Sequence, residues 1–216
     1  MNKKGSSFSW VVGVDYNLED LLPWWYENVK KWAPEPDITI CDFGMTPWGK
    51  TIAKDYADTY LEYTIHERLA WFYKPRALLE TPYEYKCWLD IDCEVMAPID
   101  DIFTYATDDK MALTQDVGKG LEDFWWATGV NVAKGNPKIL RDWSYVCEHS
   151  HLRGDQEVLK EMIQEDSSYH DMIVLMPIEY QWLRVLLEVG EANPNTKIMH
   201  WTGPSGKKHI RENLMK

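Results

Sequence analysis

The sequence has no short motif that identifies a ligand by itself. None of its four cysteines is spaced as a CxxC pair, so a structural zinc site is not expected. The first apolar run, Phe8 to Val14, is followed by neither the GxGxxG pattern nor the GxxxxGK[ST] pattern of phosphate-binding loops. A dinucleotide-binding fingerprint and a Walker loop are therefore excluded, and any nucleotide must be held by other means.

The chain also lacks a long apolar run and a positive net charge. No stretch is long enough to span a membrane, and no signal peptide is recognisable, so a soluble cytoplasmic protein is expected. The 23 basic and 35 acidic side chains give a net charge of −12, which repels nucleic-acid phosphates. A small phosphate-bearing ligand is still compatible with this charge, because a bound divalent cation can invert the local field.

What the chain does contain is a large supply of core-forming residues. Hydrophobic residues make up 45% of its 216 residues, enough for one globular domain spanning 1–216. No repeat, linker or low-complexity tract divides it. Tryptophan is abundant, at 12 residues; most are expected in the core, and any at the surface offer flat faces for stacking on sugars or bases.

Predicted strands and helices alternate along the chain, which indicates an α/β fold. Strands are predicted over 8–14, 37–41, 60–64, 86–90, 111–114, 128–133, 172–176 and 197–200. Helices are predicted over 18–32, 76–80, 99–105, 137–149 and 155–164, with a loop and a short helix over 46–58.

The most informative segment is the acidic pair Asp90 and Asp92, at the end of the apolar run that begins at Lys86. Residues two apart in a strand point to the same side, so the two carboxylates are expected together. Like charges held close are costly unless a cation compensates them, and a hard divalent ion with oxygen ligands is suitable. Ligands of open α/β sheets bind at this end of the strands. The alternative is a turn with two solvated aspartates.

Further along the chain, several motifs resemble those of the GT-A glycosyltransferases, most closely the glycogenin-like family eight. The segments Tyr73–Leu79 and Lys86–Asp92 resemble that family's helix and the strand after it, which ends in Leu-Asp-x-Asp. Four later segments are also similar to motifs of this family. Trp126–Val130 resembles its Phe-Asn-Ala-Gly-Val motif, and Gly154–Leu159 resembles its Gly-Asp-Gln-x-x-Leu motif. Met176–Gln181 resembles its Leu-Pro-x-x-Tyr-Asn motif, and Met199–Pro204 resembles its His-Phe-x-Gly motif.

The sequence departs from the family pattern at three places. Ala127 and Gln181 each replace an asparagine, and the Lys-Pro-Trp that follows the last motif is absent. Lys207 and Lys208 stand one or two places beyond the position of that lysine.

The resemblance implies a single GT-A domain with a mixed, mostly parallel central sheet flanked by helices. It also implies transfer of a hexose from a nucleoside-diphosphate sugar, most simply a UDP-sugar, to a hydroxyl acceptor such as a glycan. Mn²⁺ or Mg²⁺ is the implied cofactor, with Asp90, Asp92 and His200 as its ligands. For His200 the alternative is a hydrogen-bonded core histidine.

For the nucleotide, the resemblance points to Val14, Asp15 and Tyr16, which end the first strand and would hold the base and ribose. Lys74 is the expected contact to the donor sugar or phosphate, and Arg76 is expected to orient an acidic site residue.

A loop from Gly203 is expected to close on the diphosphate with Lys207 and Lys208. Each of these basic residues has the simple alternative of an exposed surface charge.

Around the reacting sugar, the resemblance places Asp155 and Gln156. Asp155 fits a helix N-cap equally well. Asp123 is a further carboxylate on the acceptor side, where Trp125 and Trp126 are expected to form a platform for a sugar.

Two other functions remain open at the level of the sequence. One is a sugar-binding module with a GT-A fold that has lost catalysis, which Ala127 and the high tryptophan content favour. The other is a nucleotidyltransferase, although the segment from Val12 to Asn17 supplies no glycine-rich phosphate loop. The donor, acceptor, linkage, stereochemical outcome and oligomeric state are not determined by these motifs.

Overall fold

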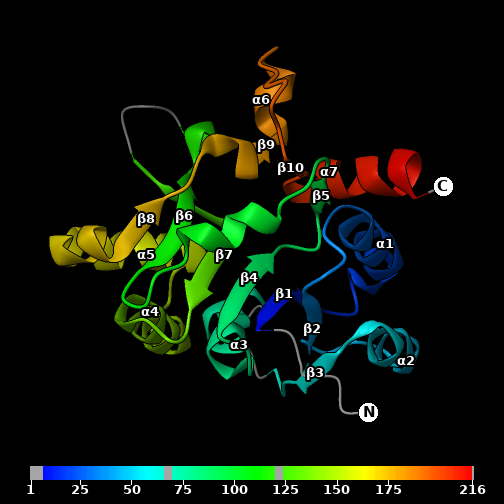
Figure 1. The fold of residues 1–216 in the computed structure, drawn as a ribbon, viewed down its shortest axis with the longest axis horizontal. Coiled ribbons are helices and arrows are strands. Elements are labelled where there is room, and N and C mark those ends of the chain that lie inside the picture. The colour runs from blue at the N-terminus through cyan, green and yellow to red at the C-terminus, as the bar shows by residue number, and fades with distance from the viewer. Residues whose placement is uncertain (1–6, 66–69, 120–123, 216) are drawn as a thin grey trace.

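The computed structural model describes residues 7–65, 70–119 and 124–215 (Figure 1). Its centre is a seven-stranded sheet in the order β3-β2-β1-β4-β7-β6-β8. The strands are β1 Phe8–Val14, β2 Asp37–Asp42, β3 Thr59–Glu62, β4 Tyr85–Leu89, β6 Met111–Gln115, β7 Trp126–Lys134 and β8 Ile173–Leu175. Only β7 runs antiparallel to its neighbours β4 and β6, while the other pairings in this sheet are parallel. The expected mixed, mostly parallel sheet is confirmed.

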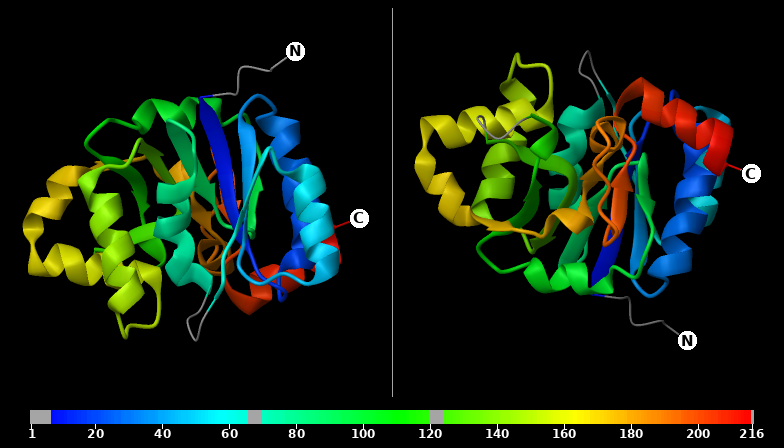
Figure 2. Two further views of the ribbon diagram at one scale, coloured as in Figure 1. Left: turned by 90° about the horizontal axis from the view of Figure 1, so that it is seen from below. Right: turned by 90° about the horizontal axis from the view of Figure 1, so that it is seen from above.

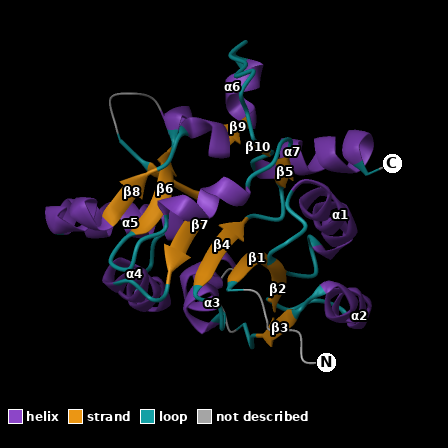
Figure 3. Cartoon of the chain, in the orientation of Figure 1, coloured by secondary structure: helices purple, strands orange, loops and turns teal. Residues whose placement is uncertain are grey.

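A second, three-stranded sheet lies beyond the carboxyl end of β4 (Figure 3). It contains β5 Cys93–Val95, β10 Ile198–His200 and β9 Trp182–Leu183, in the order β5-β10-β9. Neither β5 nor β9 was predicted, because strands this short show no period-two pattern. The antiparallel pairing of β10 with β5 brings the end of the chain back to the turn after β4.

Helices cover both faces of the large sheet (Figure 2). Two of them, α1 Leu22–Trp32 and α2 Pro47–Tyr56, pack on one face. The opposite face carries α3 Lys74–Glu80, α4 Lys138–His149 and α5 Asp155–Glu165. Two short helices, α6 Arg184–Glu188 and α7 Gly203–His209, follow β9 and β10. Short 3-10 turns precede α1 and α3 and occupy Asp100–Tyr105, where a helix was predicted.

Alternation along β1 divides the core into two clusters, one on each face of the sheet. Trp10, Val12 and Val14 point to the cluster under α1 and α2, whereas Val11 points to the cluster under α3, α4 and α5. All four cysteines are free and buried, as their apolar surroundings indicate. No helix in the described ranges is long and apolar enough to cross a membrane.

One local prediction is wrong. The segment from Gly203 was expected to be a loop, but it forms α7, which continues as a π-helical turn over Ile210–Leu214. Gly203 has a φ of +74°, Pro204 occupies the first turn, and Gly206 allows the helix to approach the backbone of Trp201. Lys207 is therefore held on a helix.

Lys86 is a buried lysine whose titration should make the stability of the fold depend on pH. Its ammonium donates to Asn136 Oδ1 at 2.7 Å, and no carboxylate in the described part of the chain pairs with it. Burial lowers the pKa of Lys86 to about 8. Because the unfolded chain then binds more protons between pH 8 and about 10.5, the contribution of Lys86 to stability should rise with pH across that window by up to about 3 kcal/mol.

Urea unfolding of the wild type and of Lys86→Met at pH 7.5 and pH 10 measures this change. The free energy of unfolding of the wild type, relative to the variant, should increase at the higher pH. A relative stability that is the same at both pH values would contradict the prediction.

Candidate active site

A cavity of about 490 Å³ opens at the carboxyl ends of β1 and β4. Asp15 follows the first of these strands, and Asp90 and Asp92 follow the second. The start of α5 and the start of α7 close the other sides of the cavity. This end of an open α/β sheet is where ligands bind, so the cavity is the candidate active site.

The two aspartates are neighbours for a different reason from the one predicted. The strand β4 ends at Leu89, and the Cys93 N–H donates to the Asp90 carbonyl at 2.9 Å, which closes a turn over these residues. Strand alternation therefore does not place Asp90 and Asp92 together. The turn does so, with its first residue fixed by the bond from the Asp90 N–H to the Gly129 carbonyl at 2.8 Å.

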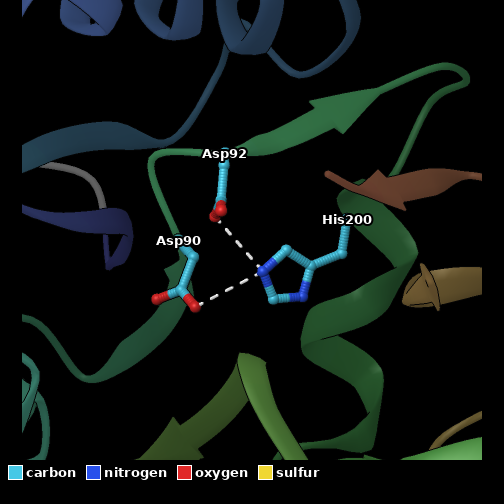
Figure 4. Close-up of side chains that lie close together, drawn as sticks. All are labelled: Asp90, Asp92 and His200. Atoms are coloured by element: carbon cyan, nitrogen blue, oxygen red, sulfur yellow. Dashed lines mark ion pairs between the residues drawn. The ribbon is translucent and has the colours of Figure 1, made fainter. Parts of the chain in front are cut away.

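His200 joins the two aspartates from the far end of the chain (Figure 4). It ends β10 opposite Cys93 of β5, and its Nε2 lies 3.2 Å from Asp92 Oδ1 and 3.6 Å from Asp90 Oδ2. One ligand atom from each of these three residues lies within 4.8 Å of the others. Two carboxylate oxygens and one imidazole nitrogen at this spacing fit a divalent metal ion.

The imidazole of His200 is tightly enclosed. A Cβ atom on Gly129 would lie 2.3 Å from its Cε1, so only glycine leaves room for the ring. Gln181 Oε1 accepts the Val130 N–H at 2.8 Å, and Gln181 Nε2 lies 3.1 Å from His200 Nδ1. Gly129 and Gln181 therefore fix where the Nε2 edge of the ring points.

Two lysines neutralise the carboxylates of the pocket. Lys74 is 3% exposed, and its ammonium lies 3.2 Å from Asp90 Oδ1 and 3.1 Å from Asp155 Oδ2. Lys207, on α7, lies 2.5 Å from Asp92 Oδ2. The expectation that charge alone would require a bound cation at the acidic pair is therefore too strong, because these lysines already compensate it.

The pKa values of the buried groups reflect this network. Burial would raise the pKa of Asp92, but His200 and Lys207 outweigh burial and hold it below its usual range. Burial would likewise lower the pKa of Lys74, but Asp155 and Asp90 raise it. Burial dominates at Asp155, whose pKa is raised. Asp92 and Lys74 are therefore stabilised in their charged forms.

Of the residues predicted to hold the nucleotide, Asp15 lines the cavity. Its carboxylate accepts the backbone N–H of Asn17 at 3.0 Å. The side chain of Val14 is buried in the core, and Tyr16 is 64% exposed outside the cavity. Phe43, which was not predicted, lies against the end of β1 and lines the cavity. Gly13 permits this approach, since an added Cβ would lie 2.0 Å from the Phe43 ring.

Two of the predicted basic contacts lie outside the cavity. Arg76 pairs with Glu80 and Glu148, because a position two residues beyond Lys74 lies on the opposite side of α3. The side chain of Lys208 is 72% exposed and lies 3.8 Å from Glu212, whereas Lys207 faces the pocket. Both Arg76 and Lys208 therefore match the surface-charge alternative.

Asp155 and Gln156, which were predicted to lie beside the reacting sugar, both line the cavity. Asp155 is the first residue of α5 and pairs with Lys74, while Gly154 holds the N-cap position, so the capping alternative is wrong. Asp123 lies outside the described residues.

Of the two tryptophans predicted to form a sugar platform, one lines the cavity and the other does not. Trp125 lines the cavity, but Trp126 is buried in β7 and packs against the ring of Phe124. Trp71 was not predicted, yet it lines the cavity and its indole donates to the Arg153 carbonyl at 3.1 Å. Asp116, which binds Gln156, was also missed, although its place directly after β6 is the signal that singled out Asp90.

No family model matches the sequence, and no curated protein matches it. Solved structures do match. The galactosyltransferase LgtC, solved with donor and acceptor sugar analogs, superimposes with a TM-score of 0.67 at 13% identity over 96% of each chain. A glycosyltransferase involved in glycosylation of the major capsid of PBCV-1 superimposes with a TM-score of 0.62 at 11% identity over 94% of this chain and 98% of the other.

The glycosyltransferase GlyE of Streptococcus pneumoniae TIGR4 gives a TM-score of 0.67 at 15% identity, over 91% of this chain and 55% of GlyE. At these identities the likeness establishes the fold. The predicted GT-A fold, and with it the resemblance to GT-A glycosyltransferases at the level of architecture, is confirmed.

The enclosure of His200 predicts that Gly129→Ala weakens metal binding. The added methyl must displace the imidazole, and changes of this kind around a metal ligand cost about tenfold or more in affinity. Calorimetric titration with Mn²⁺ measures the loss. Gly154→Ala is the matched control, because its Cβ would meet no other group closer than 3.8 Å. Equal Mn²⁺ affinity in the Gly129→Ala variant and the wild type would contradict this account.

Proposed function

We propose that this chain is a metal-dependent glycosyltransferase that moves a hexose from a nucleoside-diphosphate sugar, a UDP-sugar, to a hydroxyl of an acceptor such as a glycan. The observation that carries the proposal is the convergence of Asp90, Asp92 and His200 in one cavity. That cavity lies in a fold shared with solved glycosyltransferases, one of them in complex with donor and acceptor sugar analogs.

Asp90, Asp92 and His200 would hold the metal ion. The mixture of carboxylate oxygens and an imidazole nitrogen suits Mn²⁺ better than Mg²⁺, which prefers oxygen ligands and retains several waters. When bound, the metal supplies positive charge that offsets the negative charge of a departing diphosphate. The position of His200 next to both carboxylates supports this assignment.

Lys207 is the residue we assign to the diphosphate. Its ammonium contacts Asp92 from the last turn of α7, beside the candidate metal ligands. A diphosphate bound there would compete with Asp92 for this lysine, and charge-assisted bonds from an ammonium to phosphate oxygens are strong. Lys207 would then neutralise the leaving group together with the metal.

Lys74, Asp155 and Gln156 form the wall that we assign to the donor sugar. Lys74 ties Asp155 to Asp90, so the sugar-binding wall and the metal-binding turn are held in one geometry. Hydroxyls of a hexose can donate to the Asp155 carboxylate. Asp15, at the end of β1, remains our candidate for the ribose or base.

One alternative has a specific observation in its favour. Asp90 forms an ion pair with Lys74, and Asp92 forms one with Lys207. These ion pairs would also suit a GT-A fold that binds sugars without a metal and without catalysis. The nucleotidyltransferase alternative has no comparable support, since the turn after β1 carries no glycine-rich phosphate loop.

Calorimetric titration of UDP-glucose and UDP-galactose, with and without Mn²⁺, tests the proposal, together with an assay of UDP release. We expect Mn²⁺-dependent binding and slow donor hydrolysis, both lost in Asp92→Asn. The matched control is Asp108→Asn, a carboxamide at a carboxylate that is 78% exposed and pairs with Lys134. Metal-independent binding without UDP release would favour the sugar-binding module, and no binding at all would overturn the proposal.

The pairing of Lys207 with Asp92 predicts opposite effects on two ligands. Lys207→Met should bind Mn²⁺ alone more tightly, because the lysine no longer competes for Asp92. The same variant should bind UDP in the presence of Mn²⁺ about 10- to 100-fold more weakly, because a charge-assisted bond of about 1.5–3 kcal/mol is lost. Lys208→Met, which alters the exposed neighbour, should change neither affinity. Parallel shifts in both affinities would contradict the competition.

A further inference from the structure

Asp116 lies behind the wall of the cavity, where both of its carboxylate oxygens are used. It follows β6 directly and is 8% exposed. Its Oδ1 accepts the Gly118 N–H at 3.0 Å, and its Oδ2 accepts a hydrogen bond from Gln156 Nε2 at 2.7 Å. Its own N–H donates to the Trp125 carbonyl at 2.8 Å. Asp116 therefore connects two residues that line the cavity, Trp125 and Gln156.

The chemistry of this contact decides which way the Gln156 amide faces. A carboxylate can only accept hydrogen bonds, so Gln156 must turn its NH₂ group toward Asp116. Its carbonyl oxygen Oε1 is then left for the cavity that Gln156 lines. No residue in the part of the chain that the structure describes donates a hydrogen bond to this oxygen.

The carboxylate cannot easily rotate to release the amide. The turn that Asp116 forms with Gly118 is packed, since a Cβ on Gly118 would lie 3.0 Å from Leu183 Cδ1 and 3.0 Å from Val185 Cγ2. The turn itself needs only one carboxylate oxygen. The second oxygen is free for Gln156, and its bond therefore points to a role beyond the turn.

We propose that Asp116 is a positioning residue, which presents the Gln156 carbonyl oxygen to the cavity as an acceptor for a hydroxyl of the bound sugar. This inference rests on the proposed function and deepens it. The cavity would recognise a hydroxyl, a hydrogen-bond donor, at the place where Gln156 meets the sugar. Asp116 would act on the sugar only through the orientation of Gln156.

The Asp116→Asn variant reverses that orientation with almost no change of shape. Because the Gly118 N–H must meet an oxygen, the new amide has to place its NH₂ group toward Gln156. Gln156 then has to turn over and present its own NH₂ to the cavity. We expect unchanged Mn²⁺-dependent binding of UDP, a smaller gain in affinity from UDP to UDP-hexose, and UDP release about 10- to 100-fold slower.

A second substitution should restore the oxygen. In the double variant Asp116→Asn with Gln156→Glu, the introduced carboxylate accepts a hydrogen bond from the introduced amide and presents its other oxygen to the cavity. The double variant should therefore release UDP faster than Asp116→Asn alone. Gln156→Glu alone should be impaired, because two carboxylates would lie where a 2.7 Å hydrogen bond now lies. Full activity in Asp116→Asn, or a double variant no faster than it, would overturn the proposal.

A readout that needs no substrate separates this inference from the proposed function. The side-chain NH₂ signals of Gln156, identified in a ¹⁵N spectrum by their loss in Gln156→Glu, should move upfield in Asp116→Asn as the charge-assisted bond disappears. If the Gln156 NH₂ signals do not move in Asp116→Asn, the proposed orientation of the Gln156 amide is wrong. If the wild type binds no UDP-hexose in the presence of Mn²⁺, the proposed function is wrong. The spectrum still tests whether Gln156 donates a hydrogen bond to Asp116.

Discussion

The cavity depends on the pairing of three carboxylates with two lysines. Asp90, Asp92 and Asp155 share a space that Lys74 enters from α3 and Lys207 enters from α7. Removing one partner of a buried pair costs about 3–5 kcal/mol, because it leaves an uncompensated charge. These contacts therefore tie α3, α5, α7 and the turn after β4 to one geometry.

The two lysines of this network differ in how easily their carboxylate partners could be replaced by another anion. Lys74 is enclosed and bridges two carboxylates, so it is a permanent part of the wall. Lys207 makes a single ion pair from a more exposed position on a short helix. The metal ion and diphosphate that we propose for this cavity would bring opposite charges, and Lys207 would then exchange Asp92 for phosphate oxygens without leaving either charge unpaired.

Much of the fold could be predicted because each major strand and helix carries its own periodic signal. The strand from Phe8 to Val14 and the helix of residues 138–149 are examples. Short elements such as β5 were missed because three residues carry no measurable period, and α7 was missed because Gly203 and Pro204 were read as loop residues. For the site, the Asp90–Asp92 pair and His200 could be found from motifs, whereas the link from Asp116 to Gln156 depends on contacts between distant segments.

The sequence by itself determined the type of fold and the absence of a glycine-rich phosphate loop, since these follow from local pattern. The three candidate metal ligands were identified from an acidic pair and from motifs that resemble those of GT-A glycosyltransferases. Only the tertiary structure decided which charges meet. Lys207 faces Asp92 and Lys208 faces solvent because successive residues of a helix point in directions about 100° apart. His200 reaches Asp90 and Asp92 because β10 pairs with β5, a contact between segments about 100 residues apart, which neither segment encodes alone.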